Sequence, residues 1–137
     1  MEPAYKQLAA LHLEIAMYRA SVERALKPGG KWVRGTLESI IERMRVECQR
    51  FMMGQYAAVV NVSYLAEIGC EYIIRETDVP NVETFTTVTR EILQAMAEEV
   101  LLRPLPELIR VRLCSSALEV GPSLERLQAH IRSGGSS

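Results

Sequence analysis

A glycine-rich turn carries the residues of this chain that are best suited to bind a charged ligand. Lys27, Gly29, Gly30, Lys31 and Arg34 surround the start of a predicted helix. Free backbone amides and the positive end of the helix dipole favour an anion at such a place, and cationic side chains add to the attraction. The alternative is an ordinary turn, since paired glycines commonly separate two helices. The pattern therefore allows two interpretations, an anion or diphosphate site and a plain turn.

Within this turn, the segment GGKWVRG resembles the GGKxxRP stretch of polyprenyl diphosphate synthases. In that family the basic residues meet the diphosphate, so the resemblance implies a diphosphate contact at Lys31 and Arg34. The resemblance is confined to this segment, has a glycine where the family has a proline, and is not accompanied by a DDxxD metal motif. A helical ligand-binding or enzymatic subunit is accordingly our second functional hypothesis.

Acidic residues recur on one face of a later helix. Glu67, Glu71 and Arg75 follow one another at four-residue steps, together with Ser63. Paired carboxylates at this spacing can bind a metal or transfer protons, but a metal site in a bundle generally needs further ligands, such as a histidine on a facing helix. We interpret the residues as a solvated polar strip with an ion pair between Glu71 and Arg75.

The two histidines, His12 and His130, lie in no pattern with Asp, Cys or Ser that would suggest a catalytic triad. A small helical bundle also rarely builds an oxyanion hole. We interpret both as ordinary, partly buried side chains. The sequence predicts no catalytic residue, no metal ligand and no cofactor, and it favours a protein that is not an enzyme.

Charge and cysteine content limit the partners and the compartment. The net charge of the 137-residue chain is -1, and the arginines between residues 34 and 50 are interspersed with glutamates. This is typical of a solvated helix face rather than of a phosphate-binding track, so we expect no nucleic-acid partner. The three cysteines form no CxxC pair, which predicts free thiols in a reducing, cytoplasmic compartment. No signal-peptide pattern is present at the start, and carboxylates interrupt the apolar run 56–74, so we expect a core helix and no membrane span.

Helices must position these residues, and the longest apolar pattern runs from Lys31 to Arg75 without a proline. Apolar residues recur in it at i, i+3, i+4 and i+7, which is typical of one helix face. A straight helix of this length would extend about 65 to 70 Å, whereas a compact domain of this size is about 35 to 40 Å across. We therefore predict either a long helix covered by another polypeptide or a kink that folds it back, for which Gly54 is the natural position.

Further helices are predicted on both sides of this stripe. A helix over 3–26 should end at the Lys27–Gly30 turn and pack antiparallel against the 31–51 half. A second helix, capped by Asn81 and ending near Arg103, should pack along the 56–74 half by the same short-loop argument.

The remainder of the chain completes the predicted fold. Residues 105–120 fit a helix better than a strand, because a lone strand would have nothing to pair with. Gly121–Pro122 should end this helix before a short last one. The fold class is thus all-α, an elongated antiparallel helical bundle of about four to six helices on one long central helix. Residues 1–132 form a single helical domain and 133–137 a flexible tail.

The apolar cluster Phe51–Met52–Met53 is too broad for one narrow stripe, and methionine adapts well to the groove of a partner. A plain core where helices cross is the alternative. The following residues 56–62 are apolar nearly all round, so they should be wrapped on several sides. Because the predicted neighbouring helices are few and short, we expect the region 51–74 to be under-covered. The candidate partner interface consists of Phe51, Met52, Met53, Tyr56, Val59, Val60, Tyr64, Ile68 and Tyr72.

These observations favour a non-catalytic interaction protein, such as an adaptor, an assembly chaperone or a subunit of a complex. The partner would be a second copy in a homodimer or a different protein in a hetero-complex.

Overall fold

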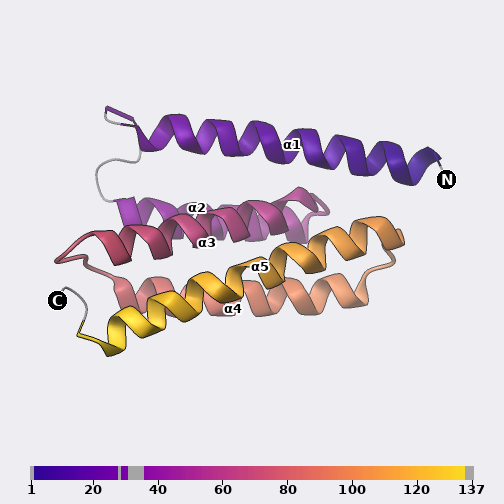
Figure 1. Ribbon diagram of the computed structural model, residues 1–137. Coiled ribbons are helices and arrows are strands. Elements are labelled where there is room, and N and C mark those ends of the chain that lie inside the picture. The colour runs from indigo at the N-terminus through magenta and orange to yellow at the C-terminus, as the bar shows by residue number, and fades with distance from the viewer. Residues whose placement is uncertain (1, 28, 31–35, 135–137) are drawn as a thin grey trace.

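Five α-helices make up the computed structural model, which describes residues 2–27, 29–30 and 36–134, apart from the side chains of 2–4 and 116–118. Consecutive helices run in opposite directions, so α1, α3 and α5 point one way and α2 and α4 the other (Figure 1). The described residues contain no strand, and the predicted all-α bundle is confirmed. The helices are α1 (Glu2–Leu26), α2 (Thr36–Met52), α3 (Ala57–Arg75), α4 (Val82–Leu102) and α5 (Glu107–Arg132).

The long apolar stripe is divided between α2 and α3. The break falls at Gly54, whose φ of 95° is in the left-handed region that glycine adopts without Cβ strain. The Gln55 amide donates to the Arg50 carbonyl across this turn at 3.0 Å, which satisfies one of the last carbonyls of α2. α3 then folds back and packs against α2. Of the two alternatives predicted for the stripe, the fold-back at Gly54 is the one present.

α3 is the central helix of the bundle. It packs against each of the other four helices, and its first seven residues, 57–63, are all buried. A helix that is apolar nearly all round needs such neighbours on several sides, as the sequence predicted. By length and composition alone α3 is also able to cross a membrane, but 67% of the apolar window is buried inside the bundle, as in a core helix.

The neighbours of α1 and α4 differ from those expected from short loops. α1 packs on α3 and α5 rather than along α2, and only side chains link it to α2: the Tyr18 hydroxyl accepts a hydrogen bond from Arg43 Nε at 3.2 Å. α4 packs more closely on α2 than on α3. The short loops set the antiparallel directions of the helices, but the apolar faces decided which helices pack together.

The prediction that Gly121–Pro122 ends a helix is wrong. α5 continues through Pro122 as one helix (Figure 1). Pro122 is exposed, while Val120 and Leu127 on either side of it are buried on the face that packs along α3. Extended packing on one face thus compensates for the backbone hydrogen bond that proline cannot make.

The ends of α4 and α5 complete the comparison with the prediction. α4 ends at Leu102, next to the expected Arg103. Asn81 does precede α4, with a backbone φ of 66°, but its side chain makes no capping hydrogen bond. Its side-chain Nδ2 donates to Glu38 Oε1 at 2.9 Å instead. Of the predicted flexible tail, residues 135–137 lie outside the described residues.

Candidate functional site

Four large apolar side chains are exposed at one end of the bundle, where α2 turns into α3 and where α4 ends. Met52 is 42% exposed, Met53 79%, Leu101 69% and Leu102 80%. We call this surface the apolar end. Single exposed apolar residues are common, but several gathered at one place are typical of a surface that binds another molecule.

Arg103 holds the two segments of the apolar end together. Its Nη1 donates to the Phe51 carbonyl and its Nη2 to the Met52 carbonyl, each at 3.1 Å. The guanidinium lies 4.8 Å from the centroid of the Phe51 ring, and its Nε is 3.2 Å from Glu99 Oε2. Carbonyls at the end of a helix have no partner within the helix, so Arg103 acts as a C-terminal cap for α2 supplied by α4.

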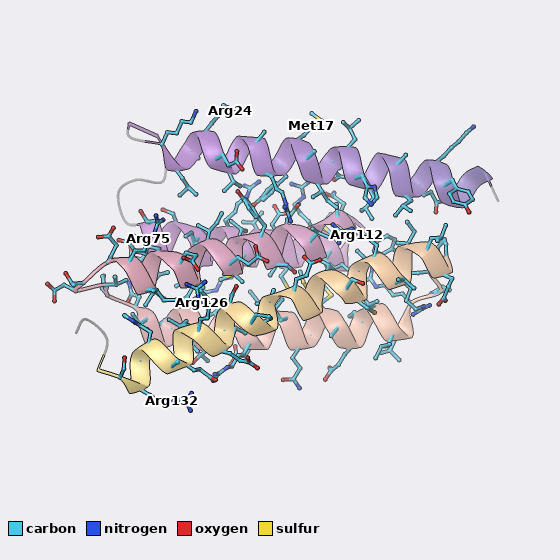
Figure 2. The ribbon with its side chains drawn as sticks, viewed as in Figure 1. Met17, Arg24, Arg75, Arg112, Arg126 and Arg132 are labelled. Carbon is cyan, nitrogen blue, oxygen red and sulfur yellow. The ribbon has the colours of Figure 1, made fainter. Side chains whose placement is uncertain are left out.

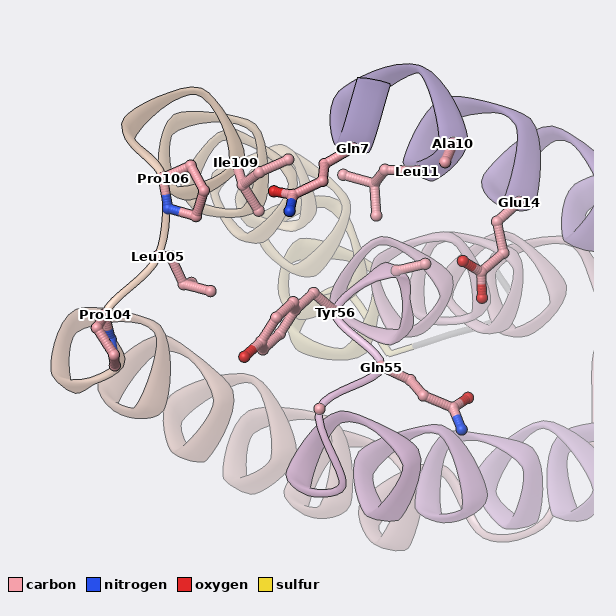
Figure 3. Close-up of a pocket in the computed structure, with 12 residues that line it drawn as sticks. Gln7, Ala10, Leu11, Glu14, Gln55, Tyr56, Pro104, Leu105, Pro106 and Ile109 are labelled. Carbon is pink, nitrogen blue, oxygen red and sulfur yellow. The ribbon is translucent and has the colours of Figure 1, made fainter. Parts of the chain in front are cut away.

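A pocket of about 560 Å³ opens beside the apolar end (Figure 3). Glu14 enters it from α1, Tyr56 from the α2–α3 turn, and Leu105 from the α4–α5 loop, so three segments far apart in sequence form its walls. Its lining consists of Gln7, Ala10, Leu11, Glu14, Gly54, Gln55, Tyr56, Ala57, Pro104, Leu105, Pro106 and Ile109.

The opposite end of the bundle has a different character. The α3–α4 loop exposes Glu76, Thr77, Asp78 and Asn81. The outer face of α1 is more apolar, with Leu13 63% and Met17 64% exposed; Met17 projects away from the other helices (Figure 2). Ile131, which is 45% exposed, lies beside the α3–α4 loop, so large exposed apolar side chains occur at the opposite end and on the outer face of α1 as well as at the apolar end.

The structure distributes the predicted interface residues over three environments. Met52 and Met53 are exposed, as an interface would require. Phe51, Val59 and Val60 are at most 1% exposed, so they belong to the core and not to the surface. The remaining residues are half-buried: Tyr56, Tyr64, Ile68 and Tyr72.

The region 51–74 as a whole is therefore not under-covered, contrary to the expectation. The reason is α5, which runs past Pro122 and packs along α3 more extensively than any other helix does. A broken α5 would have left part of α3 uncovered.

A buried polar cluster was missed in the sequence. Glu47 is completely buried; its Oε1 accepts a hydrogen bond from Asn61 Nδ2 at 3.0 Å, and its Oε2 lies 3.4 Å from Arg43 and 3.6 Å from Arg50. The signal was present, because Glu47 follows Met44 by three residues and precedes Phe51 by four, on the buried face of α2. The cluster joins α2 to α3 through groups that need one another as partners.

The predicted polar strip on α3 is only partly solvated. Glu71 pairs with Arg126 of α5 and not with Arg75, while Ser63 is buried and donates to the Val59 carbonyl at 3.0 Å. Burial raises the pKa of Glu67, an effect that Arg19 opposes and Glu119 reinforces. Glu71 thus links α3 to α5. Within the described residues no group of three or more His, Cys, Asp or Glu side chains is arranged to hold a metal.

The other candidate residues are dispersed. His12 is exposed rather than partly buried, and His130 is half-buried at the other end of the molecule.

At the glycine turn, Gly29 has a φ of 83° and the Gly30 amide donates to the Lys27 carbonyl at 2.7 Å. Lys31 and Arg34 lie outside the described residues, so the anion site stays a prediction.

The three cysteines, Cys48, Cys70 and Cys114, are free, as predicted. Burial raises the pKa of the Cys70 thiol to about 12, with a smaller contribution from Glu71 and Glu67. Cys70 is thus an inert core residue rather than a candidate nucleophile.

Comparisons with protein-family models, with curated proteins and with solved structures gave no significant match to this chain.

Proposed function

We propose that this protein is a non-catalytic helical interaction protein, an adaptor, assembly chaperone or complex subunit, whose protein partner docks on the apolar end. The observation that carries the proposal is the exposure of Met52, Met53, Leu101 and Leu102 at one end of the bundle. Burying them against a partner would remove apolar surface from water, which is the main favourable term in most protein associations. Methionine also lets such a surface adapt its shape to a partner.

The rigidity of the surface also supports this proposal. Arg103 links the backbone that carries Met52 to the end of α4, so both segments are ordered before a partner arrives. Backbone segments that are already linked in the free protein lose less conformational entropy on association, while the methionine side chains that they carry can still adapt. The partner is either a second copy of the chain or a different protein.

The test is native mass spectrometry of the protein isolated from its own host. The variant pairs Met53→Lys with Leu102→Lys, and the matched control pairs Leu13→Lys with Met17→Lys, which changes side chains of comparable exposure on the outer face of α1. We expect the first variant to lose the companion or dimer mass and the control to keep it, with circular dichroism unchanged in both. A parent protein that is monomeric and without companions at micromolar concentration would contradict the proposal, as would equal retention in both variants.

A further inference from the structure

The pocket beside the apolar end has the size and wall chemistry of a small-molecule site. Its volume of about 560 Å³ is in the usual range for ligand pockets, roughly 300 to 1,000 Å³. Such sites combine mainly apolar walls with a few polar groups that orient the ligand. Here Leu11, Leu105 and Ile109 contribute apolar surface, and Gln7, Glu14, Gln55 and Tyr56 contribute the polar groups.

Glu14 is the one charged residue among those that line the pocket. Its carboxylate points from α1 into the space above the α2–α3 turn (Figure 3). Within the described part of the chain it takes part in no ion pair or hydrogen bond. No lysine, arginine or histidine is among the described residues that line the pocket. A ligand therefore meets a single negative charge that still lacks a partner.

The arginines around this end of the bundle are engaged elsewhere. Arg50 donates to Gln55 Oε1 at 2.7 Å and also faces Glu47. Arg103 donates to the last carbonyls of α2, and Arg110 donates to the carbonyls of Val100 and Arg103 at 2.5 and 2.8 Å. These contacts engage all three guanidinium groups, and none of the three pairs with Glu14.

From this arrangement we propose that the pocket binds a small apolar molecule that carries one protonated amine. The hydrocarbon or aromatic part lies against Leu11, Leu105 and Ile109, and the ammonium group donates to the Glu14 carboxylate. An anion of the same shape would be repelled by the exposed Glu14 carboxylate and is disfavoured. A neutral analogue gains the apolar contact but not the charge-assisted hydrogen bond. This site does not depend on partner docking at the apolar end, so the two proposals fail independently.

The experiment compares three probes with similar apolar parts and different charge: phenylbutylamine, phenylbutanol and phenylbutyrate. Each is titrated against the full chain and followed by amide chemical shifts in NMR spectra. We expect the amine to bind about threefold more tightly than the alcohol, because Glu14 is exposed, and the carboxylate to bind most weakly. The shifts should concentrate at Ala10, Tyr56 and Leu105. Equal affinity for amine and carboxylate, no saturable binding in the millimolar range, or shifts centred elsewhere would each overturn the proposal.

Two variants separate the charge from the cavity. Glu14→Gln should remove the advantage of the amine over the alcohol while leaving alcohol binding unchanged, and Glu42→Gln, an exposed carboxylate on α2, is the control that should keep that advantage. Ala10→Phe places a ring in the pocket from an exposed position on α1 and should abolish binding of all three probes without unfolding the chain. Retention of the amine preference in Glu14→Gln would also overturn the proposal.

Discussion

Arg103 and Phe51 form a double contact: the Arg103 guanidinium stacks 4.8 Å from the centroid of the Phe51 ring and donates to the carbonyl of the same residue at 3.1 Å. The Arg103 side chain therefore packs against the buried Phe51 ring and also caps the C-terminal end of α2. Lysine has the same charge but lacks the planar fork that makes both contacts possible.

Arg103→Lys should consequently lower the free energy of unfolding by about 1 to 2 kcal/mol, because the hydrogen bonds to the α2 carbonyls are lost. Arg90→Lys, which changes an exposed arginine on α4, should change the free energy of unfolding by no more than about 0.5 kcal/mol. Urea denaturation followed by circular dichroism measures both. Equal effects of the two substitutions would show that Arg103 does not cap α2.

The buried Glu47 cluster predicts a second stability effect. Glu47→Gln keeps an acceptor for Asn61 but removes the charge that faces Arg43 and Arg50, so we expect a loss of about 1 to 3 kcal/mol. Glu42→Gln is the exposed control and should be nearly neutral. If both substitutions had the same small effect in denaturant titrations, the cluster would not contribute to stability.

The close approach of Gly69 and Phe85 predicts strong coupling between α3 and α4. A Cβ at Gly69 would lie 2.3 Å from Cε1 of the Phe85 ring, and that ring is completely buried. Gly69→Ala should destabilise the protein by about 1 to 3 kcal/mol through overpacking. Phe85→Leu shortens the opposing side chain, so the double variant should lose less than the sum of the two single losses. Additive losses in a double-mutant cycle would contradict this contact.

The raised pKa of Glu67 predicts a pH dependence of stability. The native state keeps the Glu67 proton to a higher pH than the unfolded chain, whose value is near 4.5. The native state therefore binds more protons in that interval, and the stability from the neutral carboxyl falls as pH rises from 4.5 through the native pKa. Glu67→Gln should flatten this decline, whereas the exposed control Glu91→Gln should not. The measurement is the midpoint of thermal unfolding across this pH range. Parallel pH dependences of the midpoint for the parent and Glu67→Gln would contradict the prediction.

Cysteine labelling reports the burial of Cys70. Since burial raises the pKa of this thiol to about 12, very little thiolate is present at pH 8, and the side chain is inaccessible as well. A thiol reagent should modify the partly exposed Cys48 and Cys114 first and reach Cys70 only when the bundle unfolds. Mass spectrometry of timed samples identifies the order, and early modification of Cys70 would mean that α3 is less enclosed than described.

The sequence predicted the helices and their directions better than their neighbours. Lys27–Gly30 and the prolines at 104 and 106 mark turns by backbone chemistry that acts locally, so those boundaries were found, and Gly54 was identified as the place for a break that the sequence left open. The helix break predicted at Pro122 was wrong, because the packing of Val120 and Leu127 on α3 stabilises a continuous α5 there. A local rule cannot include the stabilisation that comes from another helix.

The candidate site shows the same division. Met52 and Met53 were expected at an interface, and they are exposed. The pocket was not foreseen, because Glu14, Tyr56 and Leu105 come from three separate segments and no short motif connects them. Val59 and Val60 were expected at the interface but are buried, because α3 packs against each of the other four helices.

The position of α1 bears on how the molecule opens. α1 packs on α3 and α5 less closely than those two helices pack on each other, and its first half supplies Gln7, Leu11 and Glu14 to the pocket. Segments with fewer packed neighbours detach at a lower free energy than the global unfolding reaction. Amide hydrogens of α1 should thus exchange faster than those of α3, and the same local detachment removes one wall of the pocket. A ligand that binds only while α1 is docked should therefore slow the exchange of the α1 amides.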